Sequence, residues 1–409
     1  MYMKRENRKE TRMVREKSVN LSDVRKSNCR LIFEMLSRNN GMTLLELEQK
    51  TGLSRPTTVS MVRALEEADL VLNVGKKESN GGRTPSLYGI NPDAYYAIGI
   101  DFEYPISRVA ISDMSGIIRY GSKKEFLPEL KAVEAIEALI DQIREVIEKS
   151  GVEERRILGI GMGMPGYINL KTGMSLRFER IFDWKDIEIG KLISKSIRVP
   201  VYMENDVHLM FRAERGMWGK NVGQDALFIA IRSGIGMAIF QRGHIIEGEY
   251  GNAGHIGHMV IQANGPKCKC GNYGCLELYA SELAIRQNYE ERTGIKTETV
   301  NEIVDNADQG EEAALQVLKE AGRYLGIGIG NVVNLFDINT IIVSSYFNNH
   351  HILKSAQQEV DRCVNIPQER KVQIYPSQLE EKNFALGGCQ LVFRRNQEEI
   401  LMNVPLKNL

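Results

Sequence analysis

Apolar positions recur with helical spacing after residue 20, so ordered structure is expected to begin with an α-helix near Leu21. The polar and flexible triplet Asn39-Asn40-Gly41 is expected to end this helix. Its mostly apolar face is predicted to consist of Val24, Asn28, Leu31, Ile32, Met35 and Leu36.

Two further helices are predicted to follow at short intervals. Thr43 and Glu46 have the spacing of a capping box, ahead of a short helix that is expected to end near Thr51-Gly52. Ser54 is a suitable N-cap for the next helix, and Pro56 in its first turn costs no hydrogen bond. The buried stripe of this third helix is predicted to be Val59, Val62 and Leu65.

The second and third helices together are typical of a helix-turn-helix. They are joined by a tight turn that contains glycine, and the third helix carries hydroxyl and guanidinium groups near its start, where such groups contact the major groove. An alternative is a small helical domain that only dimerises. The residues expected to face DNA are Ser54, Arg55, Thr57, Thr58, Ser60 and Arg63.

A wing is predicted after the third helix. Residues 70–74 and 86–90 have the pattern of two strands, and the segment between them is basic and rich in glycine. Arg83 follows two glycines and is expected to reach a narrow minor groove. Residues 21–91 are therefore predicted to form a winged helix-turn-helix domain.

Beyond Asn91-Pro92 the pattern changes to strands alternating with helices, which indicates an α/β domain. An amphipathic helix is predicted at 132–150, and a long helix with several glycines at 311–336. The segments with the character of strands are 96–100, 108–112, 117–120, 157–161, 199–203, 226–231 and 340–343.

The composition is that of a soluble globular protein, with 43% hydrophobic and 26% charged residues. A chain of 409 residues is long enough for two or three domains. No apolar run approaches the ~18 residues that a membrane span needs, and the first 17 residues lack the apolar core of a signal peptide. We therefore expect the protein in the cytoplasm, without insertion into a membrane.

The formal net charge of zero conceals an asymmetry between the two parts. Residues 1–90 contain 17 Lys and Arg against 11 Asp and Glu, a net charge of +6 that the rest of the chain balances. This distribution favours a DNA-binding domain joined to a regulatory domain, and a solvated basic tail is the alternative. Residues 1–20 are expected to be a flexible basic arm.

Three of the six cysteines cluster in a short segment rich in glycine. Cys268, Cys270 and Cys275, with His258 upstream, would supply three thiolates and one imidazole, the tetrahedral set that structural zinc prefers. Four protein ligands leave no position for an activated water, so the predicted Zn²⁺ is structural. Unmetallated thiols on a glycine-rich loop are the alternative.

At this point the sequence resembles the ROK family, which groups sugar-responsive repressors with bacterial sugar kinases. The residues that carry the resemblance are Gly254-His255-Ile256-Gly257-His258 and the segment from Cys268 to Glu277, which matches the family's C-x-C-G-x-x-G-C-x-E signature. The resemblance covers nearly the whole chain. It implies an actin-like, sugar-kinase (RNase H-like) fold of two α/β lobes with a cleft between them, and a C-terminal helix at 383–395 that returns to the first lobe.

The resemblance also implies a set of sugar-binding residues. The triplet Glu204-Asn205-Asp206 matches the family's E-N-D, whose last two residues bind sugar hydroxyls; an N-cap pair is an alternative that is compatible with this role. The kinases usually have Glu at position 255, so His255 suggests altered sugar choice or pH response, with a purely structural histidine as the alternative. The complete expected set is Gly166, Asn205, Asp206, His255, His258 and Glu277.

Two departures from the family's kinases argue against an enzyme. A kinase is expected to have D-x-G-G-T after its first strand, where glycines let backbone N–H groups approach phosphate. This chain has Asp101 to Pro105 there, with both glycines replaced and an acid added. Ser344-Ser345 replaces the Gly-Gly pair that contacts adenine in the kinases, although Ser233-Gly234-Ile235-Gly236 keeps two glycines. No catalytic residue is therefore assigned, and Asp206 only occupies the position of the kinase base.

These features predict a sugar-responsive repressor of carbohydrate-utilisation genes, in which sugar bound in the cleft changes affinity for double-stranded operator DNA. The first lobe is expected at 92–202 plus 380–409 and the second, with the zinc loop, at 203–379. A homodimer or homotetramer is expected. The alternatives are an active ATP-dependent sugar kinase with an added DNA-binding domain, or a regulator controlled by a protein partner.

Overall fold

The computed structural model describes residues 21–39, 41–77, 84–127, 129–170, 172–178, 180–181, 183–218, 223–347, 350–364 and 371–406. The chain divides into two compact units. The smaller unit contains the chain up to Ala94 together with the segment that starts at Gln397, and the larger unit is Tyr95–Asn396. None of the helices in the described residues is long and apolar enough to cross a membrane.

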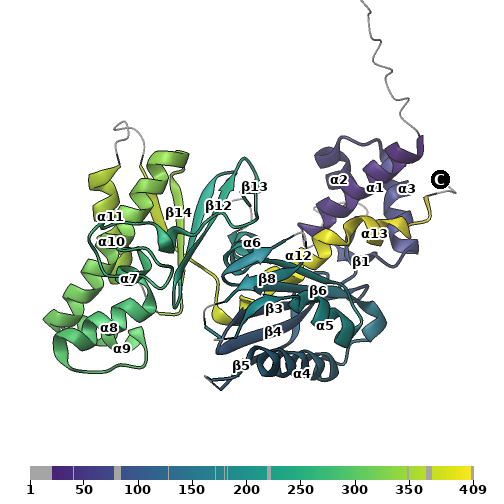
Figure 1. Cartoon of the computed structure of the whole chain (residues 1–409). Helices are drawn as coiled ribbons and strands as arrows, with labels where there is room; N and C mark the ends of the chain where they lie inside the picture. The colour runs from purple at the N-terminus through teal and green to yellow at the C-terminus, as the bar shows by residue number, and fades with distance from the viewer. Residues whose placement is uncertain are drawn as a thin grey trace, which may run out of the picture. The chain divides into compact units, whose positions relative to one another are not determined.

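The smaller unit contains the three helices and two strands that the sequence predicted (Figure 1). The capping box at the start of α2 is present, because the Thr43 side chain accepts from the Glu46 amide and the Glu46 carboxylate accepts from the Thr43 amide. Ser54 caps α3, and Pro56 lies in its first turn. The elements are α1 (Leu21–Ser37), α2 (Leu44–Thr51), α3 (Arg55–Glu67) and the antiparallel pair β1 (Val71–Lys76) and β2 (Ser86–Ile90).

Two expected helical faces differ from the structure. In α1, Val24 is exposed, whereas Cys29 and Phe33 are buried beside Ile32 and Leu36, so the buried face is rotated toward the bulkier aromatic residue. In α3, Thr58 is fully buried and its hydroxyl donates to the carbonyl oxygen of Ser54. The buried stripe of α3 runs through Thr58, Met61, Val62 and Leu65, which are spaced by three and four residues.

A short C-terminal helix, α13 (Gln397–Met402), belongs to the smaller unit, whereas the sequence analysis placed this segment in the larger domain. The Gln397 amide donates to the Glu34 carboxylate of α1 at 3.2 Å, and the Arg25 guanidinium donates to the carbonyl oxygen of Leu406 at 3.4 Å. Ile400 is buried. Six residues are too few for a periodic pattern, so the sequence could not show this packing.

The larger unit begins with a five-stranded sheet, which we call the first lobe together with the helices that cover it. Its strand order is β10-β6-β3-β4-β5, with β3, β6 and β10 parallel and β4 and β5 antiparallel. Helix α4 (Ala132–Ser150) packs on β4 and β5. The strands are β3 (Tyr96–Glu103), β4 (Ile106–Asp113), β5 (Ile118–Glu125), β6 (Ile157–Met164) and β10 (Val201–Asn205).

The second lobe repeats this topology around another sheet of order β13-β12-β11-β14-β15. Strands β11, β14 and β15 are parallel, and β12 and β13 are antiparallel, as in the first lobe. This duplication confirms the predicted actin-like architecture. The strands are β11 (Ala226–Ile231), β12 (Ile235–Gln241), β13 (His244–Ile245), β14 (Thr340–Ser345) and β15 (Gln373–Pro376).

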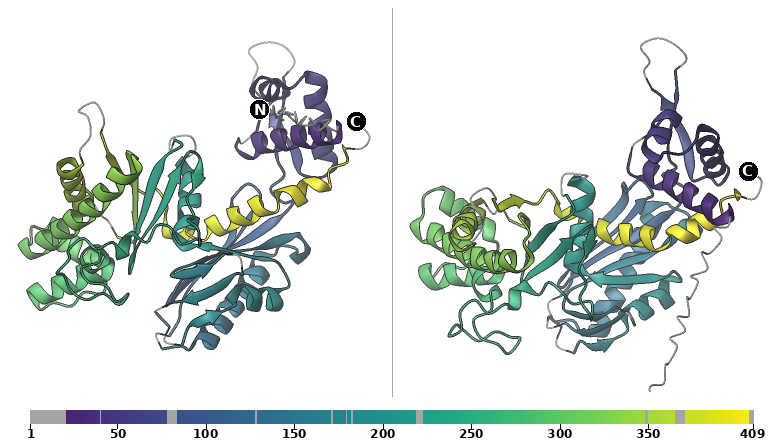
Figure 2. Two further views of the ribbon diagram at one scale, coloured as in Figure 1. Left: turned by 45° about the horizontal axis from the view of Figure 1, so that its top comes forward. Right: turned by 90° about the horizontal axis from the view of Figure 1, so that it is seen from above.

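Helices cover one face of the second sheet. Helices α10 and α11 lie side by side in all three views (Figures 1 and 2), and their apolar residues share one core with β11 and β14. The helices of this lobe are α7 (Glu277–Ala280), α8 (Glu282–Thr293), α9 (Val300–Asp308), α10 (Glu312–Phe336) and α11 (His350–Cys363).

Helix α6 (Asp206–Trp218) contacts strands of both lobes, with its apolar side chains packed in one cluster with residues of β11 and β12. A small sheet of β7 (Tyr167–Asn169), β8 (Met174–Arg177) and β9 (Lys185–Ile187) precedes it, followed by α5 (Ile189–Ile197).

The helix α12 (Leu386–Arg395) returns to the first lobe, as predicted, and packs on β3 and β6 (Figure 2). The approach is close enough to require glycine. A Cβ at Gly99 would lie 1.8 Å from the carbonyl oxygen of Ala385, and one at Gly161 would lie 2.0 Å from that of Gly388. Glycine is therefore required in both strands for α12 to pack against them.

Candidate functional site

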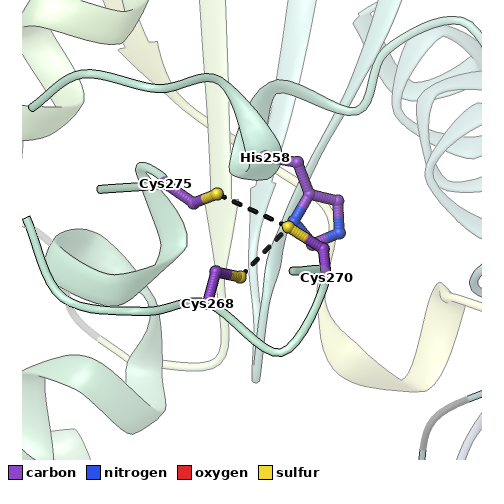
Figure 3. Close-up of side chains that lie close together, drawn as sticks. All are labelled: His258, Cys268, Cys270 and Cys275. Carbon is purple, nitrogen blue, oxygen red and sulfur yellow. Dashed lines mark hydrogen bonds between the residues drawn. The ribbon is translucent and has the colours of Figure 1, made fainter. Parts of the chain in front are cut away.

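The four expected metal ligands converge (Figure 3). Their ligand atoms all lie within 4.8 Å of one another. The Sγ atoms of Cys270 and Cys275 are 3.6 Å apart, and Sγ of Cys268 is 3.9 Å from Nδ1 of His258. Tetrahedral ligands at the ~2.3 Å of a zinc–sulfur bond would be roughly 3.8 Å apart. The cluster therefore has the donor types and spacing to hold a metal ion.

The loop that carries these ligands is held by its own backbone. The amide of Cys268 donates to the carbonyl oxygen of Asn272 at 2.7 Å, and the amide of Leu276 donates to that of Met259 at 2.9 Å. Gly274 has φ +66°, and a Cβ there would lie 1.7 Å from the carbonyl oxygen of Gln262. Only glycine fits that position, so the fold of the loop depends on it.

Glu277 begins α7 directly after the cysteine loop. Its Oε1 atom accepts a hydrogen bond from the Cys268 thiol at 3.1 Å and lies 3.4 Å from Nδ1 of His258. Its other carboxylate oxygen faces the turn at Gly234, where a Cβ would lie 3.2 Å away. The loop that gathers the metal ligands therefore also positions an expected sugar-binding carboxylate.

Gly166 lies in the turn between β6 and β7. Its φ is +79°, and a Cβ would lie 2.5 Å from the carbonyl oxygen of Arg177. A side chain at this position would meet backbone that cannot move aside, so the turn requires glycine for its own geometry.

Asn205 ends β10 and caps α6. Its Oδ1 accepts from the amides of Val207 at 3.0 Å and His208 at 3.3 Å. The N-cap role that the sequence left open is therefore confirmed. It uses the amide oxygen, and the NH₂ group of Asn205 can still donate to a ligand.

Asp206, the next residue, is buried, and the Arg232 guanidinium donates to its Oδ2 at 3.3 Å. Burial raises the pKa of Asp206 to about 6, the carboxylates of Asp101 and Glu103 act in the same direction, and Arg232 opposes them. The group therefore changes from mostly neutral to mostly ionised between pH 5 and 7.

His255 comes from the second lobe, and its ring centroid lies 4.9 Å from that of Tyr167 in the first lobe. Nearby, Oδ1 of Asn252 accepts from the amide of Ile168 at 3.2 Å. Burial, and then His258, lower the pKa of His255, so its ring is neutral at pH 7. The sequence analysis missed Tyr167, although an aromatic residue directly after a Pro-Gly turn was a visible signal.

Two arginines that the sequence analysis did not single out meet at Asp101. Arg232, directly after β11, donates through its two terminal nitrogens to Oδ1 and Oδ2 of Asp101 at 3.0 and 2.7 Å. Arg108, on β4, donates to Oδ2 of the same carboxylate at 2.8 Å. All three side chains are at most 6% exposed. We call Asp101, Glu103, Arg108, Arg232 and Glu381 the arginine cluster.

The other members of the arginine cluster surround this centre. Arg108 donates to Glu381 at 3.0 and 2.6 Å, and Glu103 lies 3.5 Å from Arg108 and 3.6 Å from Arg232. Burial alone would raise the pKa of Asp101, but Arg232 and Arg108 together lower it below its usual value. Every carboxylate of the cluster therefore has a cationic partner.

Aromatic rings cover both guanidinium groups. The rings of Tyr346 and Phe384 lie 5.0–5.4 Å from the guanidinium carbons of Arg108 and Arg232. The Tyr346 hydroxyl donates to Glu103. Glu103 stands where a kinase is expected to have the first glycine of D-x-G-G-T, and in the structure its carboxylate lies within 3.6 Å of both arginines.

On the smaller unit, the structure narrows the set of residues expected to contact DNA. Arg55 and Arg63 are exposed, and Thr57 and Ser60 are half-buried. Ser54 is exposed and caps α3, so its contact with DNA stays a prediction, whereas the burial of Thr58 corrects the expectation for that residue. Arg83 lies outside the described residues. The described candidates are therefore Ser54, Arg55, Thr57, Ser60 and Arg63.

Taken together, the two lobes define an actin-like fold, and the smaller unit has three helices that are compatible with a helix-turn-helix. The family model described as "ROK family" matches residues 98–395, and the chain belongs to this family.

Individual relatives cover most of the chain. The xylose repressor of Bacillus spizizenii is 31% identical over 374 residues, which span 90% of this chain and 95% of that protein. The DNA-binding transcriptional dual regulator NagC of Escherichia coli is 23% identical over 403 residues, 95% of this chain and 98% of that protein.

Solved structures share the fold. A ROK family transcriptional regulator, described as a homologue of the Escherichia coli MLC protein, superposes with a TM-score of 0.77 at 23% identity and covers 93% of this chain and 99% of its own. A ROK family glucokinase from Streptomyces griseus has a TM-score of 0.64 at 23% identity and covers 72% of this chain and 98% of its own.

Proposed function

We propose that this protein is a sugar-responsive transcriptional repressor of carbohydrate-utilisation genes and has no kinase activity. The observation that carries the proposal is a contrast within one unit. Apart from His255, the residues expected to bind a sugar match the family, whereas the phosphate loop has Glu103 in place of its first glycine, and this carboxylate lies 3.5 and 3.6 Å from two buried arginines. Names of relatives as repressors of sugar genes support the same conclusion.

The sugar is proposed to bind between residues of both lobes. Asn205 would donate its amide to a hydroxyl, and Asp206 and Glu277 would accept from hydroxyls. His255, whose ring packs at a tilt of 47° against that of Tyr167, would donate or accept according to its tautomer. His258 would contribute the ring nitrogen that does not face the cysteines, and Gly166 would bring the backbone close to the ligand.

The metal is proposed to be structural zinc. Three thiolates and an imidazole are the ligands that Zn²⁺ prefers in closed sites, and four ligands leave no open position for catalysis. Its role would be to fix the loop that positions Glu277. It supplies no chemistry to a reaction.

This role predicts about one zinc per purified chain. Cys270→Ser should lose the zinc, because a hydroxyl is a poor ligand in place of a thiolate, and should weaken sugar binding through Glu277. Cys363→Ser, at the end of α11, is the control. Elemental analysis checks the stoichiometry, and an unchanged zinc content in Cys270→Ser would contradict the assignment.

DNA binding is proposed through α3 in the major groove, with two winged helices of a homodimer on two half-sites. Half-sites of such dimers are separated by about one helical turn, roughly 34 Å, or by multiples of it. A change in the angle between the two lobes on sugar binding would alter this spacing and therefore the affinity for the operator.

The function is tested with the full-length protein. Sequences that it binds are selected from a random DNA pool, and affinity for the selected operator is then measured by fluorescence anisotropy at fixed salt with a panel of sugars. One sugar should change the affinity. Asn205→Ser keeps an oxygen to cap α6 but lacks the amide donor, so its response should be reduced. An operator affinity that no sugar alters would refute the proposal.

A further inference from the structure

We infer that the effector is a sugar that carries no phosphate on the hydroxyl beside Asp206, and that the arginine cluster excludes the phosphate ester. This inference rests on the proposed function, because it concerns the same site. It is carried by the hydrogen-bond partners and the charge balance around Asp206.

The place of a phosphate can be deduced from Asp206. In the kinases that the sequence resembles, the carboxylate at this position takes the proton of the hydroxyl that is phosphorylated, so a phosphate on that hydroxyl would stand beside Asp206. In this chain the cationic group beside Asp206 is the guanidinium of Arg232, which donates to the Asp206 carboxylate at 3.3 Å.

Arg232 is not available to bind the phosphate, because carboxylates already engage its guanidinium. Its two terminal nitrogens form a bidentate pair with Asp101 at 3.0 and 2.7 Å, and its Nε atom faces Glu103 at 3.6 Å. A phosphate could gain this guanidinium only by displacing a buried carboxylate, which would then lack a partner.

The balance of charge also opposes a phosphate. Within 4 Å, and among the described residues, the four carboxylates of Asp101, Glu103, Asp206 and Glu381 share three cations, namely Arg108, Arg232 and Lys123. A phosphate dianion would therefore enter a region that is already negative, whereas a hydroxyl brings no charge. Like charges brought together in a binding site cost several kcal/mol.

The backbone amides near Asp206 do not offer the phosphate another binding site. The N-terminus of α6 is the nearest helix start, and such starts commonly bind phosphate through their free amides. Here Oδ1 of Asn205 already accepts from the amides of Val207 and His208, and Asp206 itself is the first residue of the helix. This helix start is therefore closed to an anion.

Calorimetry of the full-length protein with matched pairs tests the inference. Each pair is a free sugar and a phosphate ester that keeps the same ring form, with the phosphate on the terminal hydroxyl of a hexose or an amino sugar and on a ring hydroxyl of a pentose. One free sugar should bind, and its ester should bind at least about 100-fold more weakly, which corresponds to about 2.7 kcal/mol. An ester that binds as tightly as the free sugar, or more tightly, would overturn the inference while leaving a sugar-responsive protein. Binding of neither member of any pair would overturn the proposed function as well.

A charge variant separates electrostatics from shape. Glu103→Gln keeps the length of the side chain and removes one negative charge, so the preference for free sugar over ester should narrow by about tenfold, given the cost of like charges in such a site. Glu137→Gln, on the exposed side of α4, is the matched control. It should keep the parent protein's ratio of affinities for the free sugar and its ester. Circular dichroism confirms that both variants are folded. The same ratio in Glu103→Gln and the control would overturn the electrostatic argument.

Discussion

At the scale of single residues, the arginine cluster ties the end of β3 to Arg108 of β4 and to Arg232 of the second lobe. Glu103 stands at an expected glycine position, and together with Asp101, which matches the expected pattern, it pairs with Arg108 and Arg232. The guanidinium groups stay charged and are covered by aromatic rings. Buried charges of this kind are stable only while each has its partner.

Removal of Arg232 should therefore be costly. Arg232→Met leaves Asp101 and Asp206 buried without their shared partner, and we expect the larger unit to lose about 3–5 kcal/mol of stability. Arg144→Met removes only an exposed ion pair with Asp141 and should change stability by less than about 1 kcal/mol. Urea unfolding followed by fluorescence compares the two, and equal effects would contradict the role of the cluster.

The raised pKa of Asp206 gives sugar binding a pH dependence. Because the pKa is about 6, the carboxylate is mostly protonated at pH 5 and mostly ionised at pH 7. The ionised form accepts from hydroxyls, so sugar affinity should fall about tenfold from pH 7 to pH 5. Asp206→Asn should bind weakly with a flatter profile. Calorimetric titration with sugar between pH 5 and pH 7 measures this dependence. A sugar affinity of the parent protein that does not change with pH would exclude Asp206 from the site.

At the scale of elements, close packing and caps decide the architecture. The capping box of α2 and the serine cap of α3 were visible in the sequence because both depend on residues three positions apart. The packing of α12 on β3 and β6 was not visible in the sequence, because this packing depends on glycines that are far apart in the chain. Glycine in a strand pattern signals a close approach but does not identify the partner.

A methyl group at Gly161 should displace α12. Its Cβ would lie 2.0 Å from the carbonyl oxygen of Gly388, and overpacking of this kind costs about 1–3 kcal/mol or more. In Gly121→Ala, on β5, the nearest atom lies 3.8 Å away, so this variant is the control. Thermal unfolding should show a clear loss of stability for Gly161→Ala only, and an unaffected Gly161→Ala would contradict the packing described here.

Helix α3, which we propose to bind DNA, gives a separate prediction. Arg63 is exposed on α3, and Arg63→Ala should weaken binding to the selected operator by about 1–3 kcal/mol if the guanidinium contacts a base. Arg155→Ala, exposed in the larger unit, removes the same charge elsewhere. Anisotropy at fixed salt compares them, and an equal loss in both variants would exclude a specific contact at Arg63.

At the scale of the whole molecule, the sequence predicted most of what is local. Periodicity located the three N-terminal helices of the smaller unit and the strands that begin each lobe, and cysteine spacing located the metal cluster. It missed Arg108 and Arg232, since a single arginine beside or within an apolar strand has no pattern of its own. It also misassigned Thr58, whose burial depends on the rotation of α3 against its neighbours.

The proposed function couples sugar binding to operator binding in one chain. Thermodynamic linkage between the two ligands tests this coupling most directly. The affinity for the effector sugar is measured by calorimetry with and without saturating operator DNA, and the affinity for the operator with and without saturating sugar. Each ligand must change the affinity of the other by the same factor and in the same direction. We predict such a matched change, and a sugar affinity unaltered by the operator would contradict the account.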